Sequence, residues 1–205
     1  MGDFLGSLRN TVIAGFVLAV ALIAITLAAK VTYGLQDAGF WRGAFRWFHV
    51  LCGIMWIGLL YYFNFVQIPR MKDIPANQKG AISQHIAPTA LFWFRWGAMF
   101  TVITGLILAH LNGYLHEAMT FGALSGFANP RDAFIGTGMW LGIIMFLNVW
   151  LVIWPNQKLV LGMVAADDAT KAQAAKTAMM FSRTNTLLSI PMLASMTMTQ
   201  TFFGS

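Results

Sequence analysis

Residues 45–66 read FRWFHVLCGIMWIGLLYYFNFV, a run whose only charged side chain, Arg46, lies at its start. An apolar run of this kind is long enough for an α-helix to cross the hydrocarbon of a bilayer, which takes roughly 20 residues. Of the 205 residues in the chain, 58% are hydrophobic and 10% are charged, whereas an ordinary soluble domain has about 25% charged residues. A soluble core does not account for this balance. The sequence therefore predicts an all-α, polytopic integral membrane helical bundle.

Similar apolar runs recur along the chain, which predicts about five transmembrane helices in a single membrane domain, residues 1–205. Pro69 and Pro155 are interpreted as helix ends, because proline removes a backbone hydrogen bond. Between the fourth and fifth runs, residues 156–183 mix alanine with charged residues. This pattern indicates an amphipathic inner segment, either an extramembrane helix or an extension of its neighbours. The predicted spans are residues 11–31, 45–67, 88–111, 133–154 and 184–203.

The basic residues predict the orientation of the bundle. The net charge is +6, and most lysines and arginines lie in loops on the side of the N-terminus. Because positive residues concentrate on the cytoplasmic side, the N-terminus is expected in the cytoplasm and the C-terminus in the periplasm. No nucleic-acid-binding motif accompanies the charge. The single cysteine, Cys52, excludes a disulfide framework and a cysteine-based metal site within this sequence.

Two histidines are candidate ligands of a haem iron. His49 lies near the outer end of the second predicted span and His110 near the outer end of the third, so antiparallel helices would bring them to similar depth. Two neutral imidazoles on facing helices can hold haem b through both axial positions. Gly53 would let the porphyrin edge approach, and Trp56 continues that face. In the alternative interpretation, both histidines are interfacial polar residues that bind water, loop carbonyls or lipid head groups.

The other histidines fit this site less well. His85 lies in an inner loop on the opposite side, and His116, beside Glu117, is a second axial ligand, a surface metal contact or a solvated loop residue. The sequence contains no nucleophile elbow, paired carboxylates or phosphate-binding glycine loop, which argues against hydrolase and kinase chemistry.

Arg95 lies about two turns inside the third predicted span, where a guanidinium needs a partner. Asn64, Asn148 and Asn185 belong to three other spans and fall in the same inner half of the bundle. Together these four residues are a candidate catalytic or ligand-binding site, because arginine and asparagine can hold an anionic substrate or a quinone head group. In the alternative, the asparagines join the helices and the arginine reaches the inner surface.

Several motifs resemble one known family. They are the run from Trp47 to Pro69, the run from Pro88 to Gly97, Trp154-Pro-Asn-Gln-Lys, and Ser182-Arg-Thr-Asn-Thr-Leu-Leu-Ser-Ile-Pro-Met. From about Trp47 onward, the chain is similar to the membrane domain of the PuuD-type urate hydroxylases, the urate oxidase N-terminal membrane domain family. The resemblance implies a bacterial inner-membrane protein of purine catabolism, whose membrane domain oxidises urate and passes electrons to a cytochrome c domain. The matching motifs contain His49, Trp56, Asn64, Arg95, Trp96, Asn156 and Asn185.

The sequence holds no Cys-x-x-Cys-His attachment for a covalent haem and ends soon after its last predicted span, so a stand-alone form with a separate electron acceptor is expected. The resulting hypothesis is an inner-membrane redox protein of the urate hydroxylase type. It would bind haem b at His49 and His110 and pass electrons to a separate cytochrome c or quinone. The alternative is a non-catalytic accessory or structural subunit of a larger membrane complex or homo-oligomer. In both cases the lipid bilayer is the expected partner, and nucleic acid is not.

Overall fold

The computed structural model describes residues 6–28, 34–75 and 77–204. Within these ranges every regular element is a helix, which confirms the predicted all-α class. The chain divides into two compact units, Met1–Ala44 and Phe45–Ser205. The first unit contains α2 (Leu8–Ala28) and the start of α3. The predicted single domain is not tested by this division and stays a prediction.

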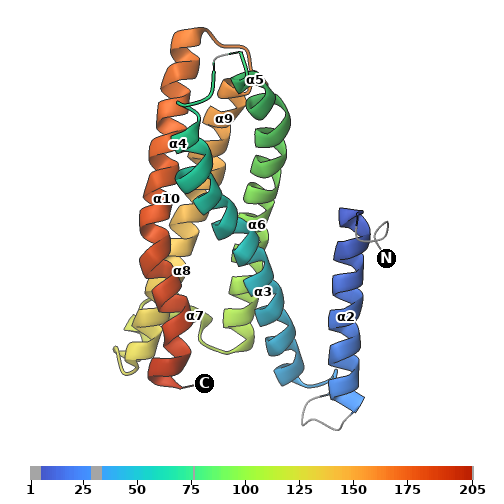
Figure 1. The fold of residues 1–205 in the computed structure, drawn as a ribbon. Helices are drawn as coiled ribbons and strands as arrows, with labels where there is room; N and C mark the ends of the chain where they lie inside the picture. The colour runs from blue at the N-terminus through green and yellow to red at the C-terminus, as the bar shows by residue number, and fades with distance from the viewer. Residues whose placement is uncertain (1–5, 29–33, 76, 205) are drawn as a thin grey trace. The chain divides into compact units, whose positions relative to one another are not determined.

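Long helical rods build the second unit, and most of them combine several consecutive helical elements (Figure 1). Within it α10 runs beside α8, and α7 packs across α8 near the C-terminal end of α10. In chain order the elements are α3 (Ala38–Tyr61), η1 (Tyr62–Gln67), α4 (Ile68–Arg70), α5 (Lys79–Ala81), η2 (Ile82–Ile86), α6 (Ala87–Leu111), α7 (Leu115–Met119), η3 (Ala123–Ser125), α8 (Pro130–Leu147), η4 (Asn148–Ile153), α9 (Trp154–Val160) and α10 (Asp168–Phe203).

The described residues form four helical rods that are long and apolar enough to cross a membrane: Leu8–Ala28, Ala38–Arg70, Lys79–Leu111 and Pro130–Val160. The fold is thus that of a helical membrane bundle, as predicted. The fifth predicted span, residues 184–203, forms the C-terminal part of α10, which is not among these four, and its crossing of the membrane stays a prediction.

The amphipathic segment predicted at residues 156–183 is an extension of its neighbours. Its first residues continue the rod of α8 as far as Val160, and a turn then leads to Asp167, whose side chain accepts a hydrogen bond from the Thr170 backbone N–H at the start of α10. A carboxylate cap of this kind satisfies a backbone donor that the first helical turn leaves free. From there α10 continues without a break into the fifth predicted span.

A wider helical turn precedes a proline in three of the rods. The π-helical stretches η1, η2 and η4 end two residues before Pro69, Pro88 and Pro155. The proline ring crowds the carbonyl four residues earlier, which in each rod lies inside the π-helical stretch, and the wider turn makes room for it. The helices therefore continue through Pro69 to Arg70 and through Pro155 to Val160, where the sequence predicted helix ends.

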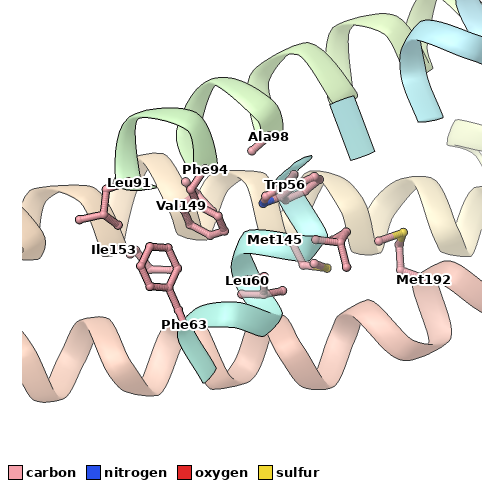
Figure 2. Close-up of a cluster of buried hydrophobic side chains, with 11 residues drawn as sticks. Trp56, Leu60, Phe63, Leu91, Phe94, Ala98, Met145, Val149, Ile153 and Met192 are labelled. Atoms are coloured by element: carbon pink, nitrogen blue, oxygen red, sulfur yellow. The ribbon is translucent and has the colours of Figure 1, made fainter. Parts of the chain in front are cut away.

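Buried apolar side chains from all the rods of the second unit meet in one cluster (Figure 2). Trp56, Leu60 and Phe63 approach it from α3 and η1. The ring of Phe63 meets that of Phe94 of α6 edge to face, with centroids 5.7 Å apart. Opposite them lies Met145 of α8, which is fully buried. This cluster is the hydrophobic core that holds the helices in register.

At one end of the second unit, which we call the α7 end, α7 packs closely on α8. Gly136 makes the contact possible, because a Cβ at this position would overlap the carbonyl oxygen of Ala118. Trp140 Nε1 donates a hydrogen bond of 3.0 Å to the carbonyl of Met119. These contacts fix the connection between the third and fourth predicted spans.

Gly136→Ala is expected to lower the free energy of unfolding by about 1–3 kcal/mol, because the added methyl group forces α7 away from α8. The matched control is Gly142→Ala on the same helix, where a Cβ would meet nothing within 4 Å. That change should be neutral or slightly stabilising, because alanine favours the helix. Thermal unfolding in detergent, followed by circular dichroism, compares the two. Equal unfolding midpoints would contradict the contact.

Candidate functional site

A cavity of about 730 Å³ lies between α3, α6, α8 and α10 at the α7 end, and we call it the central cavity. This volume falls within the range of about 300–1,000 Å³ that small-molecule and cofactor sites occupy. Its lining is largely apolar, as such sites are. The charged, amide and aromatic polar side chains in the lining are Arg46, His49, Trp56, Asn112, Tyr114, Arg131 and Gln200.

His49 is held in a defined orientation in the wall of this cavity. Its Nδ1 lies 2.9 Å from the carbonyl oxygen of Thr101 and 3.4 Å from Thr104 Oγ1. Because a carbonyl can only accept, Nδ1 carries the proton and donates, and Nε2 keeps its lone pair. The ring lies against Gly105, where a Cβ would come within 2.8 Å of His49 Cε1. Metal-ligating histidines are commonly oriented by such a bond to a backbone carbonyl.

The charged side chains that line the central cavity are basic. The guanidinium of Arg131 lies 5.1 Å from the ring centroid of Tyr114, and its Nε is buried without a hydrogen-bond partner among the described residues. With its amide oxygen turned toward Arg46, Gln200 accepts hydrogen bonds from Nη1 at 3.1 Å and from Nη2 at 3.0 Å. No carboxylate belongs to the described lining. The cavity is therefore suited to a ligand that carries negative charge.

Two aromatic side chains offer hydrogen-bond donors at the cavity. Burial raises the pKa of Tyr114, an effect that the positive charges of Arg131 and Arg46 partly offset. The phenol thus keeps its proton at neutral pH. Trp56 is 1% exposed, and its Nε1 has no hydrogen-bond partner in the part of the chain that the structure describes. An unpaired buried N–H is costly, so an acceptor on a bound ligand would stabilise the site.

His110 does not reach the central cavity. Its side chain is exposed and is absent from the described lining. His110 follows Thr101 by nine residues, about two and a half helical turns, so it points away from the face of α6 that holds His49. The pairing of His49 with His110 was predicted from their similar depth along the two helices. Depth says nothing about the direction in which each side chain points around its helix axis. Gly53 and Trp56, in contrast, line the cavity together with His49, and their role at a cofactor stays a prediction.

The three asparagines predicted as site residues bond to other helices. Asn148 Nδ2 donates to Asn185 Oδ1 at 2.8 Å, and Asn185 Nδ2 donates to the carbonyl of Met145 at 2.9 Å. Asn64 Nδ2 donates to Ser182 Oγ at 2.7 Å. Because each of these bonds joins two helical rods, the geometry favours the interpretation that the asparagines hold the helices together.

Arg95 lies apart from these asparagines. Its guanidinium carbon is 3.3 Å from the ring centroid of Trp154, and Lys158 Nζ is 6.0 Å from the same ring. This is a cation–π contact. The attraction of the guanidinium to the ring offsets part of the cost of removing its charge from water, with no carboxylate involved. Arg95 does not belong to the described lining of the central cavity. The structure therefore does not assemble the predicted site of Arg95 with the three asparagines.

Arg46 and Arg131 were not predicted as site residues, because the basic residues were interpreted as markers of membrane orientation. A signal for Arg46 is nevertheless present: Arg46, His49, Gly53 and Trp56 follow one another at spacings of three, four and three, which is the repeat of one helix face. Arg131 has no comparable signal, since it comes directly after the connection that packs through α7.

One family model matches part of the chain. The family described as urate oxidase N-terminal matches residues 109–203, which is just under half of the sequence. The match includes the Trp154 and Ser182 motifs and the stretch that supplies Arg131 and Gln200 to the central cavity. The predicted resemblance is confirmed over these residues. No curated protein and no solved structure matches the chain.

Asn185→Ala is expected to lower the free energy of unfolding by about 1–3 kcal/mol, because it removes the acceptor of the Asn148 amide and one of the hydrogen bonds that the Met145 carbonyl accepts. The matched control is Asn156→Ala, since Asn156 Nδ2 donates only to the Val152 carbonyl of its own rod. A double-mutant cycle of Asn148→Ala and Asn185→Ala, measured by unfolding in detergent, should give a coupling of about 0.5–2 kcal/mol. A coupling of zero would show that the two side chains do not interact.

Proposed function

We propose that this chain is a membrane redox protein of urate oxidation that holds haem b in the central cavity, with His49 as a ligand of the iron. The observation that carries the proposal is the hydrogen bond that orients the His49 ring. Its Nδ1 is bonded to the Thr101 carbonyl, and this leaves the lone pair of Nε2 available to a metal in the cavity. The match to the urate oxidase N-terminal family supports a urate-related function.

The residues of the central cavity fit haem b in size, polarity and charge. A volume of about 730 Å³ is far more than a purine would fill, and the largely apolar lining suits a porphyrin ring. Haem b carries two carboxylate groups, which Arg46 and Arg131 would hold as charge-assisted hydrogen bonds. Gly53 adds no side chain to the wall beside His49. When bound, haem b accepts and releases single electrons.

The residues of this chain position the ligand and exclude water. The Thr101 carbonyl fixes the tautomer of His49 and increases the basicity of Nε2. Trp56 and the methionines Met139, Met192 and Met196 contribute apolar surface to the lining, which lowers the local dielectric around a bound group. Hydroxylation of urate by water releases two electrons and two protons, so the electrons leave for an acceptor outside this chain, a cytochrome c or a quinone.

The proposal includes the bacterial inner membrane and an N-terminus in the cytoplasm, which follow from the distribution of lysine and arginine. In this orientation, and with the fifth span crossing the membrane, the α7 end and the central cavity face the periplasm. A soluble cytochrome c would then meet the protein at the end where His49 lies. At this end Arg46 and Arg131 both belong to the cavity lining, where they would hold the anionic groups of the ligand.

The absorption spectrum of the purified protein tests the haem. A Soret band that sharpens and shifts on reduction with dithionite is expected in the wild type. His49→Ala should lose most of it, while His110→Ala should keep it, because His110 is exposed and outside the cavity. Circular dichroism shows whether each variant is folded. A wild type without a Soret band, or a folded His49→Ala with undiminished haem, contradicts the proposal.

Urate oxidation is tested separately. Haem-loaded protein in liposomes, given urate and oxidised cytochrome c or a soluble quinone, is expected to reduce the acceptor and consume urate. The folded His49→Ala variant is the matched control and should show neither. If the haem-loaded wild type leaves both urate and acceptor unchanged, the part of the proposal that concerns urate is wrong, whatever the spectrum shows.

A further inference from the structure

A second cavity lies in the other half of the second unit, toward the turn between α9 and α10. Its volume is about 270 Å³, and we call it the π-helix pocket. Most of its lining is apolar, and its polar side chains come from four different rods. The lining includes Phe63, Gln67, Ser83, Phe94, Ile153 and Ser182.

Three π-helical stretches meet at this pocket. Phe63 and Gln67 belong to η1, Ser83 to η2 and Ile153 to η4. Each stretch makes room for a proline two residues further on, and the wide turns change the direction of the side chains that follow. Single π-helical turns inside α-helices occur often at functional sites. The lining of the pocket thus includes side chains from all three π-helical stretches.

The pocket presents a buried acceptor and a buried hydroxyl donor for which the described residues supply no partner. Gln67 Oε1 is buried and has no hydrogen-bond partner among the described residues. Ser182 is 7% exposed; its Oγ accepts from Asn64 Nδ2 at 2.7 Å, and its own hydrogen meets no acceptor within the described ranges. Buried polar groups are nearly always paired, so a bound molecule that both donates and accepts fits them.

The lining favours an uncharged, flat ligand. No charged side chain belongs to the described lining of the pocket, and burying an unpaired charge there would be costly. Phe63 and Phe94 form one wall with their rings at 85° to each other, and Leu91 lies beside them. A ligand with negative charge is better matched to the central cavity, where Arg46 and Arg131 lie.

We infer that the π-helix pocket binds the head group of a membrane quinone. Gln67 Oε1 accepts a hydrogen bond from a hydroxyl of the quinol form, and the Ser182 hydroxyl donates to an oxygen of the ring. The role as electron acceptor rests on the function proposed above. In that role, one quinone takes up two electrons released from urate, delivered singly, and two protons from water, and becomes the quinol.

Equilibrium dialysis of the purified protein against a short-chain ubiquinol, kept reduced with dithionite, tests the site directly, because only the quinol form carries the hydroxyl from which Gln67 Oε1 would accept. The wild type should bind saturably, and Gln67→Leu and Ser182→Ala should each weaken binding about tenfold, as the loss of one hydrogen bond does. The matched control is Gln173→Leu, since Gln173 lies on α10 but is exposed and outside the pocket. A straight-chain alcohol without the ring should not compete.

The outcomes separate the two proposals. His49→Ala should bind quinone like the wild type, because His49 lies outside this pocket. A wild type that shows a Soret band but no saturable quinone binding overturns the inference alone. Binding that is unchanged in both Gln67→Leu and Ser182→Ala, or that urate or the straight-chain alcohol displaces, also overturns it. Quinone binding by a protein without haem would instead remove the proposed function.

Discussion

In a membrane bundle, a polar group has to find its hydrogen-bond partner within the protein, and this requirement sets the rotation of each helix about its axis. The bond from His49 to the Thr101 carbonyl orients α3 against α6, while Asn64, Asn148 and Asn185 join the rods of α3, α8 and α10. Buried polar atoms without a partner in the protein indicate where a bound ligand could supply one. Trp56 Nε1, Arg131 Nε and Gln67 Oε1 have no partner among the described residues, and each belongs to the lining of a cavity.

The two cavities differ in a way that follows from their residues. The central cavity is large and basic and contains an oriented imidazole, whereas the π-helix pocket is small and uncharged and is lined by three wide helical turns. The buried cluster around Leu60 lies between them: Trp56 also lines the first cavity, and Phe63 and Phe94 line the second. One hydrophobic core thus positions both sites. This arrangement suits a protein that takes electrons at one cavity and releases them at another.

The sequence predicted the helical membrane bundle because hydrophobic runs report directly on helices that lie in lipid. It also placed Gly53 and Trp56 on the face of His49, since helical periodicity relates residues on one element. It did not predict that His110 points away or that Arg95 stacks on Trp154, because such contacts depend on how separate helices rotate and pair. The prolines were interpreted as helix ends because the local rule for proline does not include the π-helical turns that let a helix continue.

The central claim is that His49 is a ligand of a haem iron in the central cavity. Resonance Raman spectroscopy of the purified ferrous protein, prepared with natural and with ¹⁵N-labelled histidine, tests it most directly. The account predicts an iron–nitrogen stretching band that moves to lower frequency with the label and disappears in a folded His49→Ala variant. A haem whose spectrum is insensitive to the label, or an iron–histidine band that persists in His49→Ala, would contradict it.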